Sequence, residues 1–327
     1  MHTFDEQEQA VSQVAIIIPT HNHAHLIGET LESALAQTFP DVEIIVVDDG
    51  STDNTREVVA SFGDRVRYLW QPASGGPGSP RNLGVRSTAA EFLTFLDSDD
   101  LLMPNKTEMQ VQYLAAHPEC DLVFGDCAYM ELDGRDIPDS TTFTERAWNG
   151  DASLTQLIRS NVITVVAPLV RRSAFERVGG FHTSMHQEDY DLWLRIAAMG
   201  TIAGTRDIVA KVRLGPSRRS SDRLSTIRGD VEMFERFQVN FPEMMAHHGD
   251  ALKRRLTNVY LALGIALHDD GERLAALKAF QASLRYDRFN RSSYVRLVLL
   301  LLSGRQVLSL KRQRARLREA RPRLSLR

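Results

Sequence analysis

The chain has 327 residues, of which 43% are hydrophobic and 25% are charged, an ordinary composition for a globular protein with a sizeable core. Its only cysteines, Cys120 and Cys127, provide neither a disulfide framework nor the spacing of a zinc site. Residues 1–13 contain no apolar run typical of signal peptides, and no apolar stretch approaches the roughly 20 residues that span a bilayer. We therefore exclude a disulfide-rich secreted domain and a membrane-spanning helical protein, and we expect a cytoplasmic location.

Strand and helix patterns alternate through the first third of the chain. The apolar, β-branched run Val14 to Ile18 predicts a strand that is buried on both faces and stops at Pro19. The further expected strands are Val42 to Val47, Val66 to Trp70 and Phe92 to Leu96, with helices over about 26–35, 54–61 and 81–87 between them. This alternation predicts an α/β fold with a mostly parallel sheet flanked by helices, in which ligands bind at the carboxyl ends of the strands.

The remaining elements become irregular and then purely helical. Expected in order are a helix (Asn105 to Ala116), a strand (Leu122 to Phe124), a polar region to about 150, a helix (Leu154 to Arg159), a strand (Val165 to Val170) and an amphipathic helix (Gln187 to Met199). We expect an N-terminal tail (1–13), a catalytic domain (14–229), a helical C-terminal region (230–303) and a basic tail (304–327). Spacing in the helical region fits one tetratricopeptide-like helix pair, which would have to pack on the catalytic domain or on a partner.

The basic tail contrasts with the net charge of -3, because its 24 residues carry nine lysines and arginines against one glutamate. Beside an apolar segment, such a tail is suited to the anionic inner face of the cytoplasmic membrane. A solvated helix face or a disordered tail would have the same composition. The sequence leaves both interpretations open, and it indicates no nucleic-acid partner.

Three acidic segments carry the chemistry. Asp97-Ser98-Asp99-Asp100 follows a predicted strand and could hold Mg²⁺ or Mn²⁺, although the same residues could cap a helix. Asp48-Asp49 follows another strand and could contact the imide and ribose of a nucleoside, or form an ordinary Asp-Gly turn. Glu188-Asp189 opens a helix and offers a carboxylate as general base, or two helix-start acids.

Five segments in the same order resemble family 2 glycosyltransferases of the GT-A fold over residues 12–215. They are Ile16 to Asn22, Val46 to Asp53, Arg81 to Gly84, Phe95 to Asp100, and Gly179 to Phe181 with Glu188 to Trp193. The resemblance implies a GT-A type, Rossmann-like domain with an α-helical C-terminal extension. It also implies binding of a nucleotide sugar, with UDP as the expected nucleotide.

The resemblance further implies roles for individual residues. Those that would bind the nucleotide sugar are Pro19, Thr20, Asp48, Asp49, Arg81, Asp97 and Ser98. Asp97 and Asp99 would supply the metal-binding D-x-D motif, with Asp100 as a further ligand or as a group behind them. Asp189 would be the general base of a single inverting displacement, and Gly180, Glu188 and Trp193 would shape the acceptor side.

One segment departs from the family pattern. Members often carry a Tyr-Arg-x-His loop that closes over the diphosphate, and here Val212 to Gly215 keeps Arg213 but has glycine in place of the histidine. Arg213, Arg218 and Arg219 could serve instead as a charged clamp on the diphosphate.

The expected function is that of an inverting, hexosyltransferase-like enzyme of polysaccharide and cell-envelope biosynthesis, with a glycan or a lipid-linked hydroxyl as acceptor. Acceptor choice is expected to lie in residues 126–165 and in the tail. The alternative is a non-catalytic nucleotide-sugar-binding scaffold that recruits a partner through its helical tail. A nucleotidyltransferase would release pyrophosphate, and we would expect it to carry a glycine- and lysine-bearing phosphate loop that the first strand lacks.

Overall fold

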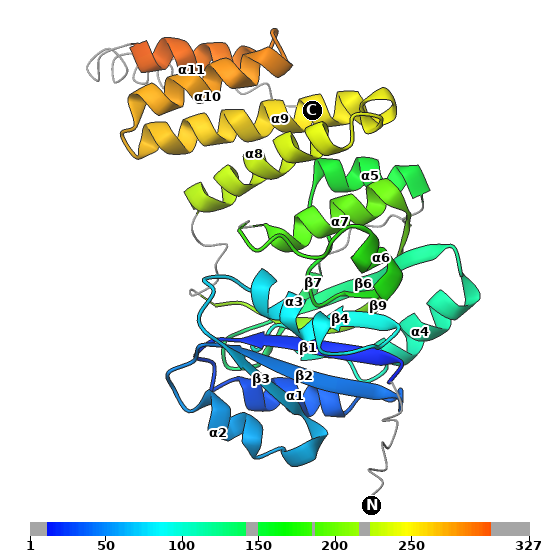
Figure 1. Cartoon of the computed structure of the whole chain (residues 1–327). Coiled ribbons are helices and arrows are strands. Elements are labelled where there is room, and N and C mark those ends of the chain that lie inside the picture. The colour runs from blue at the N-terminus through cyan, green and yellow to red at the C-terminus, as the bar shows by residue number, and fades with distance from the viewer. Residues whose placement is uncertain (1–11, 142–149, 185–186, 216–222, 302–327) are drawn as a thin grey trace, which may run out of the picture. The chain divides into compact units, whose positions relative to one another are not determined.

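The computed structural model describes residues 12–141, 150–184, 187–215 and 223–301 (Figure 1). The chain divides into two compact units. The first contains residues up to Ser221 together with Phe237–Met244, and the second contains Asp222–Arg236 and the residues from Met245 onward.

A single nine-stranded sheet forms the centre of the first unit, with strand order β3-β2-β1-β4-β8-β6-β9-β5 and with β7 paired to β6. The strands are β1 (Val14–Thr20), β2 (Val42–Asp49), β3 (Arg67–Gln71), β4 (Phe92–Phe95), β5 (Leu101–Leu102), β6 (Cys120–Met130), β7 (Asp136–Thr141), β8 (Pro168–Arg171) and β9 (Thr201–Arg213). Strands β3, β2, β1 and β4 are parallel, whereas β8 runs antiparallel to both β4 and β6. The sheet is thus parallel over its first four strands, as expected, and mixed beyond them.

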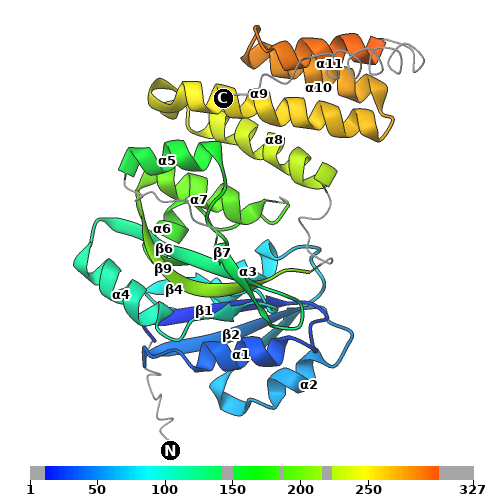
Figure 2. The same ribbon diagram turned by 180° about the vertical axis from the view of Figure 1, so that it is seen from behind.

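Helices flank the sheet. They are α1 (Ile27–Leu35), α2 (Thr55–Ala60), the 3-10 turn η1 (Gly63–Arg65), α3 (Gly78–Arg86), α4 (Lys106–Ala116), α5 (Gly150–Arg159), α6 (Arg172–Arg177) and α7 (Glu188–Met199). Of these, α1–α3 lie along the parallel half and α4–α7 along the mixed half. Helices α1 and α2 lie on one side of β1–β3, and α3 lies on the other (Figures 1 and 2). Every residue of β1 is buried. In α3, a Cβ at Gly84 would lie 2.5 Å from Ile17 and 3.3 Å from Val47, so glycine allows α3 to approach the sheet closely.

Four elements were not predicted from the sequence: β5, β7, α6 and most of β9. Strand β9 includes the exposed polar pair Arg206-Asp207, and its pairing with β6 changes register near Gly125. A Cβ at Gly125 would lie 2.3 Å from Val209 and 2.6 Å from the carbonyl oxygen of Asp207, so only glycine fits at this bend. The irregularity breaks the alternation of apolar and polar residues by which a strand is recognised.

A fully buried lysine joins three elements beneath the strand that carries the acidic segment. The Nζ of Lys106 on α4 donates to Thr94 Oγ1 (2.9 Å), Gln110 Oε1 (2.7 Å) and the Pro168 carbonyl oxygen (3.2 Å). Burial lowers the pKa of Lys106 to about 7, because the surroundings disfavour its charged form. These contacts fix β4 relative to α4 and β8.

The described part of the C-terminal region, up to Leu301, contains four helices: α8 (Arg223–Asn240), α9 (Met244–Asp269), α10 (Arg273–Tyr286) and α11 (Arg291–Leu301). A Cβ at Gly264 would lie 2.5 Å from the Phe280 ring, so α9 and α10 are in close contact there. The predicted tetratricopeptide-like pair corresponds to these two helices, and its membership of a repeat family stays a prediction. In the described residues no helix combines the length and apolar character needed to cross a membrane.

Candidate active site

The acidic segments of the sequence meet at one edge of the parallel sheet. Thr20 at the end of β1 is paired with Asp48 near the end of β2, and Leu96, directly after β4, donates its N–H to the Ile17 carbonyl oxygen (3.0 Å). The carboxyl ends of β1, β2 and β4 are therefore adjacent, at the edge where α/β sheets bind ligands.

Asp49 is held as a hydrogen-bond acceptor by the strand and loop beside it. Its Oδ1 accepts from Gln71 Nε2 (2.6 Å) and from the Ser74 N–H (3.0 Å), and its Oδ2 accepts from Ser74 Oγ (2.9 Å). Gln71 is the register partner of Asp49 on β3, and Ser74 lies in the following loop. His21 also contacts this residue, with its Nδ1 2.8 Å from the Asp49 carbonyl oxygen. Asp49 is therefore fixed and can recognise a group that donates an N–H.

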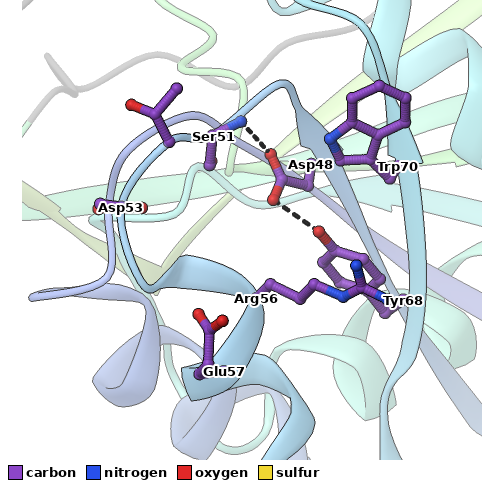
Figure 3. Close-up of a pocket in the computed structure, with 8 residues that line it drawn as sticks. Asp48, Ser51, Asp53, Arg56, Glu57, Tyr68 and Trp70 are labelled. Atoms are coloured by element: carbon purple, nitrogen blue, oxygen red, sulfur yellow. Dashed lines mark hydrogen bonds between the residues drawn. The ribbon is translucent and has the colours of Figure 1, made fainter.

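Asp48 points to the opposite side of the sheet from Asp49, because successive residues of a strand alternate between its faces. Its Oδ1 accepts from the Ser51 N–H (2.7 Å) and its Oδ2 from the Tyr68 hydroxyl (2.7 Å). Burial and the Asp48 carboxylate both raise the pKa of Tyr68. Asp48 and Trp70 are among the residues that line a pocket of about 440 Å³ (Figure 3). The side chains of Asp48 and Asp49 thus lie on opposite faces of the sheet and do not form one site. A contact between Asp48 and the nucleoside stays a prediction.

Pro19 and Thr20 both lie at the buried carboxyl end of β1, where they pair with Val47 and Asp48. The Thr20 Oγ1 is buried and has no hydrogen-bond partner among the described residues. Both residues therefore lie at the edge of the sheet where the ligand is expected, and their contacts with the nucleotide stay a prediction.

The segment from Asp97 to Asp100 forms a turn, closed by a hydrogen bond from the Asp100 N–H to the Asp97 carbonyl oxygen (3.1 Å). It leads into β5, and the next helix begins only at Lys106. The alternative that these residues cap a helix is therefore wrong. Ser98 is buried, and its Oγ lies 2.7 Å from Nδ1 of His23, a contact that sequence reasoning did not identify.

Arg81 joins the two halves of the site. It is only 2% exposed, and its Nη2 donates to Asp97 Oδ1 (2.6 Å) while its Nη1 donates to Glu188 Oε1 (2.8 Å). The arginine, from α3, thus links the acidic turn after β4 to the start of α7. The sequence predicted that these residues share a site but gave no indication that one guanidinium joins Asp97 to Glu188.

Asp189 lies beside this bridge. Burial, and next the negative charge of Glu188, raise the pKa of Asp189 to about 7, although the Arg81 guanidinium and a hydrogen bond from the Tyr190 N–H act in the opposite direction. A carboxylate with a pKa near neutral pH can take a proton efficiently, which general-base catalysis requires.

Gly180 and Trp193 support the turn that precedes α7. Gly180 has a φ of +73°, and a Cβ there would lie 2.9 Å from Asn82 Oδ1 and 3.0 Å from the Phe175 ring, so glycine is required. Asn82 holds the next residue, accepting from the Phe181 N–H (3.0 Å) and donating to its carbonyl oxygen (2.8 Å). Trp193 is fully buried, with its ring 6.4 Å from that of Phe181. Gly180 and Trp193 therefore pack against the turn that precedes α7, and the acceptor-side role expected of them and of Glu188 stays a prediction.

Arg213 stabilises the acidic turn from β9. Its guanidinium donates to the carbonyl oxygens of Asp99 (2.9 Å) and Leu132 (2.7 Å) and to Glu29 Oε2 (2.7 Å), and its N–H donates to Asp100 Oδ1 (2.8 Å). A role as diphosphate clamp would require these contacts to break, and it stays a prediction. Arg218 and Arg219 lie outside the described residues.

The acidic turn offers a partial set of metal ligands. The Asp97 side chain is 37% exposed and shares one oxygen with Arg81, Asp99 is half-buried, and Asp100 is buried against β9. Within the described ranges, no three acidic, histidine or cysteine side chains converge closely enough to hold an ion. An ion held by Asp97 and Asp99 would have to complete its coordination with water and phosphate oxygens, and the Mg²⁺ or Mn²⁺ site stays a prediction.

Comparison with known proteins agrees with this geometry. The family model for glycosyl transferase family 2 matches residues 15–179. An uncharacterized glycosyltransferase of Rickettsia prowazekii is 31% identical over 233 residues, which cover 68% of this chain and 71% of that protein. The Escherichia coli UDP-Glc:alpha-D-GlcNAc-diphosphoundecaprenol beta-1,3-glucosyltransferase WfgD is 29% identical over 238 residues, 69% of this chain and 87% of that protein.

Solved structures share the fold at low sequence identity. S. aureus TarS 1-349 in complex with UDP-GlcNAc has a TM-score of 0.70 at 20% identity, covering 92% of each chain. The mannosyltransferase PcManGT from Pyrobaculum calidifontis, in complex with GDP-Man and Mn²⁺, has a TM-score of 0.59 at 21% identity, covering 89% of this chain and 86% of that one. The expected GT-A fold is thereby confirmed. Since the family model spans half of the chain and its relatives are glycosyltransferases, the chain belongs to glycosyl transferase family 2 and is a glycosyltransferase.

Proposed function

We propose that the enzyme transfers a sugar from a nucleotide sugar, with UDP as the nucleotide, to a hydroxyl of a glycan or lipid-linked acceptor, with inversion at the anomeric carbon. The observation that carries this proposal is the Arg81 bridge, which brings Asp97 of the donor-side turn next to Glu188 and Asp189. Donor and base need such proximity for a single displacement.

The fixed carboxylate of Asp49 supports a uracil nucleotide. Because three protein groups donate to its oxygens, it acts as an acceptor, and the N–H of the uracil imide is a complementary donor. Among similar proteins, TarS is in complex with UDP-GlcNAc and the E. coli relative is named for UDP-Glc. PcManGT is in complex with GDP-Man, so guanine, which also offers N–H donors, is the alternative base.

In the proposed reaction, ionised Asp189 takes the proton of the acceptor hydroxyl while that oxygen forms a bond to the anomeric carbon. The bond between this carbon and the diphosphate oxygen breaks with its electron pair leaving on the diphosphate. Asp97 and Asp99 would hold the divalent cation, whose positive charge would stabilise the departing diphosphate. A lipid-linked acceptor is supported by the name of the E. coli relative, a diphosphoundecaprenol glucosyltransferase.

The test compares the wild-type enzyme with Asp189→Asn, using UDP-Glc, UDP-GlcNAc and GDP-Man with Mn²⁺ and measuring released nucleoside diphosphate. The wild type should turn over at least one donor, and the variant should bind that donor but release nucleotide on the order of a thousandfold more slowly. Donor binding without any turnover would favour the scaffold alternative, whereas release of pyrophosphate would indicate a nucleotidyltransferase. Full activity of the variant would refute the assignment of Asp189.

A further inference from the structure

Helix α11 of the second unit presents an exposed apolar face. Tyr294, Val295 and Val298 are 50%, 44% and 57% exposed, and Phe289, in the turn before the helix, is 75% exposed. Exposed apolar groups of this size in one short segment are typical of an interaction surface.

The opposite face of α11 is fixed against α10 (Figure 1). Ser293 is fully buried with its Oγ 2.9 Å from Ser283 Oγ, and Leu300 belongs to the buried cluster that includes Phe280. Residues 293, 297 and 300 share one side of a helix, and residues 291, 295 and 298 share the other. The apolar face is therefore held outward by the packing of α10 and α11.

Positive charge borders this face. Arg288, Arg291 and Arg296 are exposed, α11 contains no acidic residue, and the Arg288 guanidinium lies 4.8 Å from the centre of the Phe289 ring. The sequence that follows adds the nine basic residues of the tail. An apolar helix face with basic residues at its border matches the boundary region of an anionic lipid bilayer.

A second copy of the chain fits the same face less well. A symmetric contact through α11 would place the same arginines opposite each other, and like charges across an interface oppose association. Anionic lipid instead offers negative charge to the arginines and hydrocarbon to the valines.

We propose that Phe289 and the exposed face of α11 (Tyr294, Val295 and Val298) form a peripheral membrane-binding surface for anionic phospholipid. The basic tail supplies a second, purely electrostatic signal, and two signals are needed for stable anchoring. This surface does not depend on which nucleotide sugar the enzyme uses.

The test measures co-sedimentation of the full chain with vesicles of phosphatidylcholine alone or mixed with phosphatidylglycerol. We expect binding to the anionic vesicles only, weakening with salt, and a drop in the partition coefficient of about tenfold or more for the double variant Val295→Asp, Val298→Asp. The matched control is Val239→Asp on α8, a 76% exposed valine one turn after Glu235, which should bind like the wild type. Circular dichroism melting should be unchanged in both variants, because the replaced side chains are exposed.

A second measurement follows insertion directly. Tyr294→Trp should gain fluorescence quenching by phosphatidylglycerol vesicles that carry brominated acyl chains, relative to the wild type. Vesicle binding that is equal in the wild type and the double variant, or quenching by brominated lipid that is no greater in Tyr294→Trp than in the wild type, would overturn the proposal. Absence of any binding of the wild type to anionic vesicles would also overturn it.

Discussion

Replacing Asp189 with asparagine should stabilise the protein at alkaline pH while it abolishes sugar transfer. Its pKa is raised from 3.8 to about 7, so the folded state binds this proton more tightly than the unfolded state does. The stability that protonation provides is therefore present below pH 3.8 and is lost as the pH rises to about 7. Asparagine stays neutral and avoids that loss.

The magnitude follows from the shift. Roughly three pKa units at about 1.4 kcal/mol each correspond to about 4 kcal/mol above pH 7. Asp189 is half-buried and interacts with Glu188, so we expect an observed gain of about 2–4 kcal/mol at pH 8.5. At pH 5.5 the wild-type group is largely protonated, and the gain should be smaller by about 2 kcal/mol.

Urea denaturation of wild type and variant at pH 5.5 and 8.5 measures this difference. The control is Asp191→Asn two residues further along α7, because the Asp191 carboxylate accepts from Arg195 at 2.6 Å and both side chains are buried. Loss of that buried pair, together with the contact between the same carboxylate oxygen and His182 Nδ1 (2.8 Å), should destabilise the protein by about 3 kcal/mol or more at both pH values. A stability gain for Asp189→Asn that does not change with pH, or no gain at all, would refute the burial-driven shift.

Variants at three further positions test individual contacts of the site. Arg81→Gln removes a positive charge and should raise the pKa of Asp189 by roughly one unit, which moves the acid limb of the pH profile of kcat/KM to higher pH. Arg81→Lys keeps the charge and should move this limb less. If the wild type and both variants have the same acid limb, the charge of Arg81 does not influence Asp189. Ser74→Ala removes the hydroxyl donor to Asp49 but keeps the backbone N–H. It should weaken UDP binding, measured by calorimetry, about tenfold and reduce the preference for UDP over CDP. An unchanged ratio of the affinities for UDP and CDP would show that the Ser74 hydroxyl does not orient Asp49. Asp99→Ala should lower donor affinity in the presence of Mn²⁺ by about tenfold or more but leave it unchanged in EDTA, and equal losses in both conditions would count against a metal ligand.

The parallel half of the sheet was predictable because its buried strands are short apolar segments that end at polar residues. The runs that became β1, β2 and β4 are mostly apolar, and polar residues that carry the chemistry stand at or just after the end of each. The resemblance to family 2 glycosyltransferases then identified which carboxylates belong together. Periodicity alone would have left Asp97 and Asp189 as unrelated acids.

The remaining features depend on contacts between residues far apart in the chain. Most of strand β9 was not predicted, because the middle of its sequence contains exposed charged residues and its pairing with β6 changes register. The bridging role of Arg81 depends on α3 and α7 meeting across 107 residues of sequence. Asp48 and Asp49 appeared equivalent in sequence, and only the alternation of β2 and their different partners on β3 separate them.

The charge balance of the site gives a physical reason to expect a divalent cation. Three carboxylates, those of Asp97, Glu188 and Asp189, surround the single guanidinium of Arg81, while Arg213 is already paired with Glu29. A nucleoside diphosphate would add further negative charge to a partly buried site, where repulsion is weakly screened. We therefore expect UDP binding, measured by calorimetry, to be about tenfold or more weaker in EDTA than in the presence of Mn²⁺ or Mg²⁺. If UDP bound equally well without a divalent cation, the positive charge would have to come from the protein, either from Arg213 after it leaves Glu29 or from Arg218 and Arg219, which lie outside the described residues.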